Sequence, residues 1–200
     1  MRTLSVTMST TLDGVVQGLG RPDEDTRGGF DHGGWGPRYT DDVMMAEMGK
    51  GMSAPGDMLF GRRTWTDFRD AWADAEDSNP FTAHLNAARK YVASTTLTDA
   101  DAWQNSVLLT GDAARSVAEL KATEGPDLAV IGSAGLVRSL QAAGLVDRYS
   151  LLIHPLVLGQ GARLFDETSP RTEFTLTHSV VTSTGVIIAT YDRVAPSDRA

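Results

Sequence analysis

Three short segments of the chain carry groups suited to holding phosphate. Gly61-Arg62-Arg63-Thr64 offers two guanidinium groups and a hydroxyl, and an arginine fork binds phosphate through two parallel hydrogen bonds. Ser94-Thr95 offers two more hydroxyls, and Gly132-Ser133-Ala134-Gly135 forms a glycine-containing turn before a helical pattern. Because the free N–H groups at a helix start favour anions, this chemistry fits a nucleotide or dinucleotide.

Each segment also has a simpler interpretation. Paired arginines beside Trp65 are typical of a solvated helix surface over a core tryptophan, and the Gly132 turn lacks the full G-x-G-x-x-G pattern. All three segments, however, follow short apolar runs typical of strands. Because ligands of open α/β sheets bind beyond the carboxyl ends of the strands, we predict one crevice that all three segments share.

Strands and helices alternate along most of the chain, which predicts an α/β fold. Strands are expected at 4–8, 57–61, 90–94, 106–110, 128–131 and 149–158, followed by an antiparallel hairpin from 174–181 and 186–191. Helices are expected at 41–52, from 62 onward, at 80–88, at 112–122 and after Gly135. Residues 70–80 are expected as a loop, and residues 18–37 as a loop long enough to act as a lid.

Composition limits the classes of protein to consider. A chain of 200 residues suits one domain, expected at 1–195 with a frayed tail at 196–200. The net charge of −8 argues against a nucleic-acid surface, and no apolar run approaches the length of a membrane span. There are no cysteines, and the four scattered histidines form no metal-binding pattern. A cytoplasmic protein without a metal, nucleic-acid or membrane partner is expected.

Five motifs, in order, resemble the dihydrofolate reductase-like superfamily, and within it the reductase domain of riboflavin biosynthesis proteins. They are LDGVV, GRRTW, YVASTT, VIGSAGL and AGLVDRYSLLIHPLVLGQGARLF, and together they span nearly the whole chain. The last motif is the one that resembles the riboflavin-type reductases rather than housekeeping dihydrofolate reductases. The resemblance implies a single three-layer domain with a mixed, mostly parallel central sheet, a C-terminal antiparallel hairpin and a homodimeric assembly.

The same resemblance implies that the crevice binds NADPH. Arg62 or Arg63 would lie near the adenosine 2′-phosphate, with Ser94 and Thr95 as its second contact, and Thr64 near the pyrophosphate. The remaining cofactor positions implied are Ser9, Val16, Gly61, Ile131, Gly132, Ser133, Ala134, Gly135 and Leu136. In the family a Gly-Gly peptide, often cis, occupies the position of Gly132-Ser133, so Ser133 departs from the family pattern.

The expected proton donor is Asp41, because family members carry an acidic residue on the first long helix, shortly after a loop tryptophan. Trp35 followed by Asp41 and Asp42 reproduces that arrangement, so Trp35 and Asp41 are the expected substrate contacts. An aspartate in the first turn of a helix also stabilises the helix dipole, which leaves a purely structural role open. Asp13 is expected to orient its own turn.

These features predict an NADPH-dependent reductase that transfers hydride to the C=N or C=O group of a small heterocycle resembling a pterin, a pyrimidine or a flavin precursor. Because these residues carry no Cys/His zinc motif, we expect no deaminase domain of the kind found in bifunctional riboflavin enzymes. Two alternatives stay open: a genuine dihydrofolate reductase, and a nucleotide- or ligand-binding protein that has lost catalysis.

Overall fold

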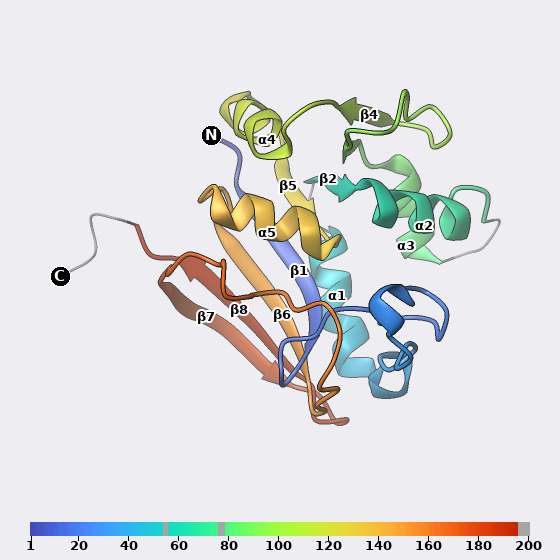
Figure 1. Ribbon diagram of the computed structural model, residues 1–200, viewed down its shortest axis with the longest axis vertical. Helices are drawn as coiled ribbons and strands as arrows, with labels where there is room; N and C mark the ends of the chain where they lie inside the picture. Colours follow the sequence, from blue (N-terminus) through green and yellow to red (C-terminus); the bar gives the residue numbers. More distant parts are fainter. Residues whose placement is uncertain (54–55, 76–78, 196–200) are drawn as a thin grey trace.

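The computed structural model describes residues 1–53, 56–75 and 79–195 and contains an eight-stranded sheet of order β4-β3-β2-β5-β1-β6-β8-β7 (Figure 1). Neighbouring strands from β4 to β6 are parallel, whereas β8 pairs antiparallel with both β6 and β7. The strands are β1 (Leu4–Thr11), β2 (Gly56–Gly61), β3 (Lys90–Ala93), β4 (Ser106–Leu109), β5 (Asp127–Val130), β6 (Arg148–His154), β7 (Phe174–Val181) and β8 (Ile187–Arg193).

Five α-helices connect these strands. They are α1 (Asp42–Ser53), α2 (Arg62–Trp72), α3 (Pro80–Ala87), α4 (Ala113–Ala122) and α5 (Ala134–Ala142). The loop between β1 and α1 contains two short 3-10 turns, Arg27–Gly29 and Pro37–Tyr39. Over the described ranges, no helix combines the length and apolar character that crossing a membrane requires.

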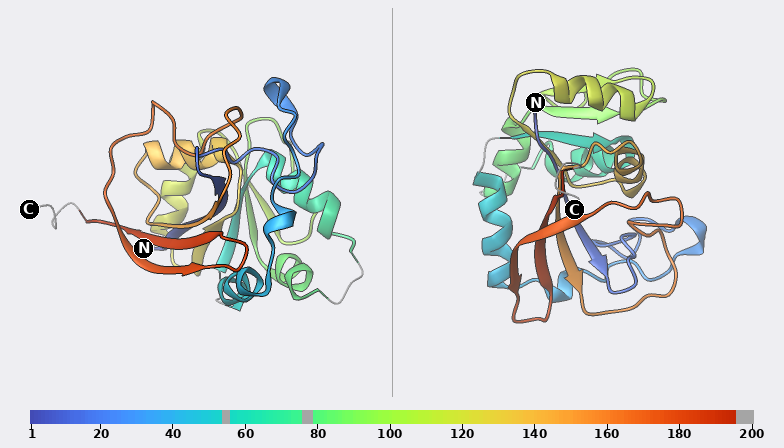
Figure 2. Two further views of the ribbon diagram at one scale, coloured as in Figure 1. Left: turned by 90° about the horizontal axis from the view of Figure 1, so that it is seen from below. Right: turned by 90° about the vertical axis from the view of Figure 1, so that its left-hand side faces the viewer.

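The helices cover both faces of the sheet, so the domain has three layers. Figure 2 shows α4 and α5 on one face and α1 and α3 on the other. Successive side chains of β2 point to opposite faces of the sheet, so this strand packs against both helix layers. Leu59 packs into the cluster under α4 and α5, whereas Met58 and Phe60 pack with Trp65 of α2. Continuous apolar runs in the sequence therefore correspond to strands buried on both faces.

The turns after β2 and β5 create the crevice of the sheet. These two strands are neighbours, yet α2 begins after β2 and packs on one face, while α5 begins after β5 and packs on the other. A sheet of this kind opens a cleft where its connections diverge to opposite faces. The two segments predicted to bind phosphate, at Gly61 and at Gly132, are those two turns.

The predicted fold class is confirmed, with two local differences. Helix α2 continues through residues predicted as a loop and ends at Trp72, whose ring packs edge-on against Phe81 at 5.2 Å between centroids. Strand β6 ends at His154 rather than at residue 158, because Pro155 has no N–H group for the ladder. The tail expected at 196–200, and residues 76–78 of the expected loop, lie outside the described residues.

Candidate active site

Two cavities lie along the carboxyl edge of the sheet. The larger has a volume of about 620 Å³ and the smaller about 430 Å³. Arg63, Ser133 and Gly135 line both cavities, so the two are parts of one cleft. The size and the position at the diverging connections are those of a cofactor or substrate site.

The residues expected to contact a cofactor all line this cleft. Those lining the larger cavity are Ser9, Val16, Arg63, Thr64, Ile131, Gly132, Ser133, Ala134 and Gly135. Those lining the smaller cavity are Gly61, Arg62, Arg63, Ser94, Thr95, Ser133, Gly135 and Leu136. The three segments that follow β2, β3 and β5 therefore meet there, as their positions at strand ends predicted, together with Ser9 and Val16. We call the part around Arg62, Arg63, Ser94 and Gly135 the phosphate end of the cleft.

Helix capping distinguishes the two helices that begin at the cleft. The side chains of Asp41, Asn79 and Asp112 accept hydrogen bonds from the first-turn N–H groups of α1, α3 and α4. The N-cap residues of α2 and α5, Gly61 and Ser133, make no such bond. The first N–H groups of these two helices therefore remain available to an anion in the cleft.

Two arginines at the phosphate end have no acidic partner in the described part of the chain, although Asp112, which caps α4, also lines the smaller cavity. Within the described residues, the Arg62 and Arg63 guanidinium groups have neither a hydrogen bond nor an ion pair. Ser94 is already engaged, because its hydroxyl oxygen accepts from the N–H groups of Thr96 and Leu97, both at 3.1 Å. The two arginines and the open helix starts thus form the part of the cleft best suited to phosphate.

Two glycines allow the turns around the cleft to approach each other. A Cβ on Gly61 would lie 2.5 Å from the Ser133 Oγ, and a Cβ on Gly132 would lie 2.8 Å from the Thr64 Oγ1. Gly132 also has a φ of +147°, which side chains rarely adopt. The Gly132-Ser133 peptide is cis. Around Gly135, in contrast, a Cβ would meet nothing within 4 Å, which leaves room beside the backbone.

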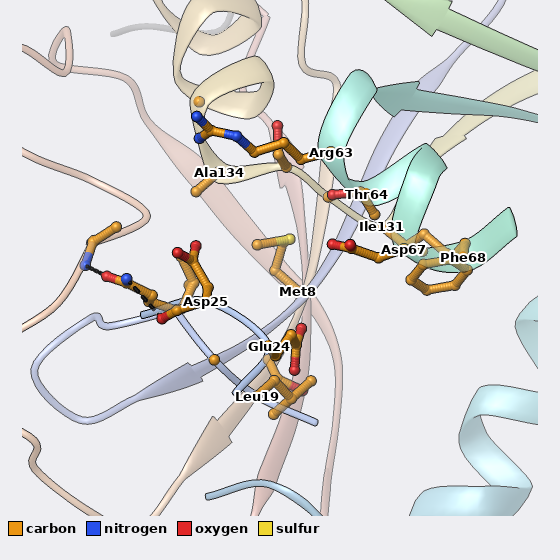
Figure 3. A pocket seen from close by; sticks show the side chains of 18 of the residues that line it. Met8, Leu19, Glu24, Asp25, Arg63, Thr64, Asp67, Phe68, Ile131 and Ala134 are labelled. Atoms are coloured by element: carbon orange, nitrogen blue, oxygen red, sulfur yellow. Dashed lines mark hydrogen bonds between the residues drawn. The ribbon is translucent and has the colours of Figure 1, made fainter. Parts of the chain in front are cut away.

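The rest of the larger cavity combines apolar and acidic side chains. Figure 3 shows Met8 at its centre, with Phe68 and the Asp67 carboxylate on one side and Leu19 and Glu24 below. Met48, Phe81 and Leu152 complete the apolar lining. We call this part the substrate end of the cleft, in contrast to Arg63 and Ala134 at its far side in the figure.

Two of the acidic groups in this cavity differ in their electrostatic surroundings. Burial raises the pKa of the Asp67 carboxyl, and the negative charge of Glu24 raises it further. The hydrogen bonds from Arg27 hold the pKa of Asp25 below its ordinary value. Asp25 is therefore neutralised by a neighbour, whereas Asp67 faces other anions.

The 18–37 loop forms one wall of the cavity and is anchored beneath it. The buried Gln17 side chain donates to the backbone carbonyls of Asp25 and Arg27, both at 3.0 Å, and accepts from the Ala162 N–H at 2.9 Å. Phe30 is buried against Val15. The predicted loop is confirmed, with residues 23–27 held over the cleft.

Asp41, the expected proton donor, does not line either cavity. Its Oδ1 caps α1 by accepting from the Met44 N–H at 2.8 Å, and its Oδ2 accepts from the N–H and hydroxyl of Ser183, both at 2.6 Å. The bonds from Ser183 and Met44 lower the pKa of Asp41. The carboxylate thus holds α1 against the β7–β8 turn, which is the structural role that the sequence left open.

Trp35, the other expected substrate contact, also lies outside the cavities. Its ring is 5 % exposed, and its Nε1 donates to the Gln17 carbonyl at 2.8 Å. The ring packs edge-on against the buried His154, with 5.0 Å between centroids. Asp13 accepts from the Thr11 hydroxyl and the Gly159 N–H, so it orients its turn as expected.

Helical periodicity could have found the residues missed at the substrate end. Asp67 and Phe68 follow Arg63 and Thr64 by four positions on α2, so they extend the same face of the helix into the cavity. Glu24 belongs to the acidic run of the loop that was expected to cover the site. Met48, Phe81 and Leu152 come from distant elements, and no local signal connects them.

The fold and the cleft define a class of protein, the dihydrofolate reductase-like α/β proteins. A dihydrofolate reductase from Enterococcus faecalis, solved in complex with NADP(H) and RAB-propyl, has a TM-score of 0.59 and 13% identity, over 96% of both chains. A pyrimidine reductase-like protein from Corynebacterium diphtheriae has a TM-score of 0.64 and 11% identity, over 97% of this chain and 92% of its own. At these identities the likeness concerns the fold.

The chain belongs to the family of the RibD C-terminal domain, whose model matches residues 2–188. A putative riboflavin biosynthesis protein from Shewanella sp. PV-4 shares the fold with a TM-score of 0.68 and 21% identity, over 96% of this chain and 99% of its own. The uncharacterised protein YyaP of Bacillus subtilis (strain 168) is 28% identical over 137 residues, which cover 67% of this chain and 72% of YyaP. The predicted family is therefore confirmed.

Proposed function

We propose that this protein is an NADPH-dependent reductase acting on a C=N or C=O group of a small heterocycle. The observation that carries the proposal is the convergence of two uncapped helix starts and two unpaired arginines at one end of a cleft. Membership of the RibD C-terminal domain family, and the fold shared with a reductase solved with NADP(H), support the same cofactor.

The chain offers a distinct contact for each charged part of NADPH. The N–H groups at the starts of α2 and α5 bind the pyrophosphate, and the open space beside Gly135 admits it. Arg62, beside Ser94 and Thr95 in the smaller cavity, binds the 2′-phosphate. Ser9 and Val16, in the larger cavity, hold the nicotinamide ring beside the substrate end.

When bound, the cofactor supplies the hydride, and the protein supplies alignment and a water-poor environment. The apolar side chains at the substrate end position a planar ring, and the 18–37 loop limits the access of water. Reduction of C=N also requires a proton on nitrogen. Because Asp41 lies outside the cleft, we assign delivery of this proton to a water molecule rather than to Asp41.

The experiment is a paired measurement of cofactor binding and turnover. NADPH and NADH affinities are determined by nucleotide fluorescence, and NADPH oxidation is followed against pterins, pyrimidines, flavins and dihydrofolate. We expect submicromolar-to-micromolar NADPH binding, weaker NADH binding, and oxidation with at least one ring substrate. No NADPH binding would refute the proposal, whereas preferential turnover of dihydrofolate would identify a folate reductase.

One rival function has an observation in its favour. The absence of the expected donor Asp41 from the cleft is consistent with a nucleotide-binding protein without catalysis. Tight NADPH binding, with no NADPH oxidation in the presence of any substrate of the panel, would favour a nucleotide-binding function without catalysis. The homodimer implied by the family resemblance also remains a proposal, which light scattering with size-exclusion chromatography tests.

A further inference from the structure

Resting on the proposed function, we propose that the substrate end selects a planar ring that carries a positive charge or amino groups, and that it rejects phosphorylated substrates. Asp67 and Glu24 are the specificity-determining residues. Both line a cavity of about 620 Å³ whose walls there are apolar, with Met8 and Phe68 next to the Asp67 carboxylate (Figure 3). A planar ring satisfies the walls, and its positive or N–H groups satisfy the carboxylates.

Among the described residues, two of the four carboxylates that line the larger cavity, Glu24 and Asp67, have no ion pair. Asp25 is paired with Arg27, and the exposed Asp23 lies 3.7 Å from Arg21. Glu24 accepts only backbone N–H groups, from Gly20 and Arg21. The Asp67 carboxylate has no hydrogen bond or ion pair with any described residue, so its acceptor capacity is open to a ligand.

The charges that face Asp67 are mainly negative. Glu24, Asp70 and Asp25 raise the pKa of its carboxyl in addition to burial, whereas the charges of Arg21 and Arg27 act in the opposite direction. A bound cation would reverse this repulsion, whereas a phosphate would add to it.

The two ends of the cleft therefore differ in charge. Arg62 and Arg63 lie at the phosphate end, and Arg138, which also lines the larger cavity, donates to the Arg163 carbonyl at 2.6 Å and faces Asp166. A dinucleotide with its phosphates on the arginines would leave the acidic end to the second reactant. Electrostatic complementarity would thus orient both reactants in one cleft.

The experiment compares three aromatic probes of similar shape at neutral pH: 9-aminoacridine, which is cationic, acridine, which is neutral, and acridine-9-carboxylate. Affinities for the full-length protein are measured by probe fluorescence without cofactor. We expect 9-aminoacridine to bind at least about tenfold more tightly than the carboxylate. Asp67→Asn and Glu24→Gln should each weaken only the cationic probe, by about threefold to tenfold.

Glu119→Gln is the matched control, because Glu119 is an exposed carboxylate of α4 that pairs with Arg115 and lines neither cavity. It should change the affinity for the cationic probe by less than about twofold. Equal binding of cation and anion, equal effects of Asp67→Asn and Glu119→Gln, or no binding of any probe would overturn the inference. A protein that prefers the cation but does not bind NADPH would refute the proposed function alone.

Discussion

The substitution Gly135→Ala should affect protein stability and NADPH affinity in opposite directions, which separates the role of the start of α5 in folding from its role in binding. Gly135 is the second residue of α5, and a Cβ built there meets no atom within 4 Å. Alanine is a better helix former than glycine, so the folded state should gain about 0.5–1 kcal/mol, or roughly 2 °C in Tm for a domain of this size. Because Cα–Cβ bonds in a helix tilt toward its N-terminus, the added methyl group points to the proposed pyrophosphate position.

The cost to binding follows from what the methyl group displaces. A hydrogen bond to a charged phosphate contributes about 1.5–3 kcal/mol, so the loss of one should raise the Kd for NADPH about tenfold to a hundredfold. The assay is NADPH titration by fluorescence, together with a thermal melt of the free protein. The variant should therefore be at least as stable as the parent and bind NADPH more weakly.

Two further glycine variants make the result interpretable. Gly49→Ala lies within α1, where a Cβ also meets nothing within 4 Å, so it should raise Tm without changing the Kd for NADPH. Gly132→Ala should destabilise the fold by about 1–3 kcal/mol, because its φ is +147° and its Cβ would meet Thr64. If Gly135→Ala bound NADPH as the parent does, the pyrophosphate would not lie against α5.

Three other predictions concern charged groups. In fluorescence titrations, Arg62→Ala should weaken the binding of NADPH about tenfold and change the binding of NADH little. Arg63→Ala, which alters both cavities, should weaken the binding of both nucleotides. If the two variants lost the same affinity for each nucleotide, this assignment would be contradicted. Asp41→Asn should lower Tm without changing the Kd for NADPH. Because the folded-state pKa of Asp41 is lowered, its carboxylate stabilises the fold above its ordinary pKa, and this stabilisation is lost as acid protonates the group. The Tm of Asp41→Asn should therefore fall less than that of the parent on acidification. An unchanged dependence of Tm on acid would contradict the capping role. Burial lowers the pKa of Lys90 to about 8 in the folded state. Between about pH 8 and about pH 10.5 the unfolded chain therefore binds more protons than the folded protein. The free energy of unfolding should rise with pH over that interval, by up to roughly 3 kcal/mol. Urea unfolding of the parent and of Lys90→Met at pH 7.5 and 10 should show the rise in the parent alone.

The sequence predicted the phosphate end of the cleft more fully than the substrate end. The residues that define the phosphate end lie shortly after a strand, either in a turn or in the first turn of the following helix, so local pattern and the parallel arrangement of the sheet together bring them to one edge. The substrate end depends on contacts between distant parts of the chain. Met48, Phe81 and Leu152 come from α1, α3 and β6, and a periodic pattern cannot show which of their faces meet.

Asp41 shows why the sequence alone does not separate a proton donor from a helix cap. Its position after a tryptophan and at a helix start agrees equally with a donor and with an N-cap. The partner that decides between them, Ser183, lies 142 positions further along the chain in the turn between β7 and β8. The sequence did not show that Trp35 lies outside the cavities for a similar reason, because its partner His154 belongs to the distant strand β6.

Helix capping connects the sequence to the site more directly than the glycine pattern does. Asp41, Asn79 and Asp112 each stand immediately before a helix and cap it with their own side chains. Gly61 has no side chain to cap α2, and the Ser133 hydroxyl does not cap α5 because it lies where a side chain on Gly61 would be. The helices with open starts are thus the two that diverge at the centre of the sheet. An anion bound there would satisfy the N–H groups of both helix starts at once, so NADPH should raise Tm more in the parent than in Gly135→Ala, by the amount that the difference in Kd sets.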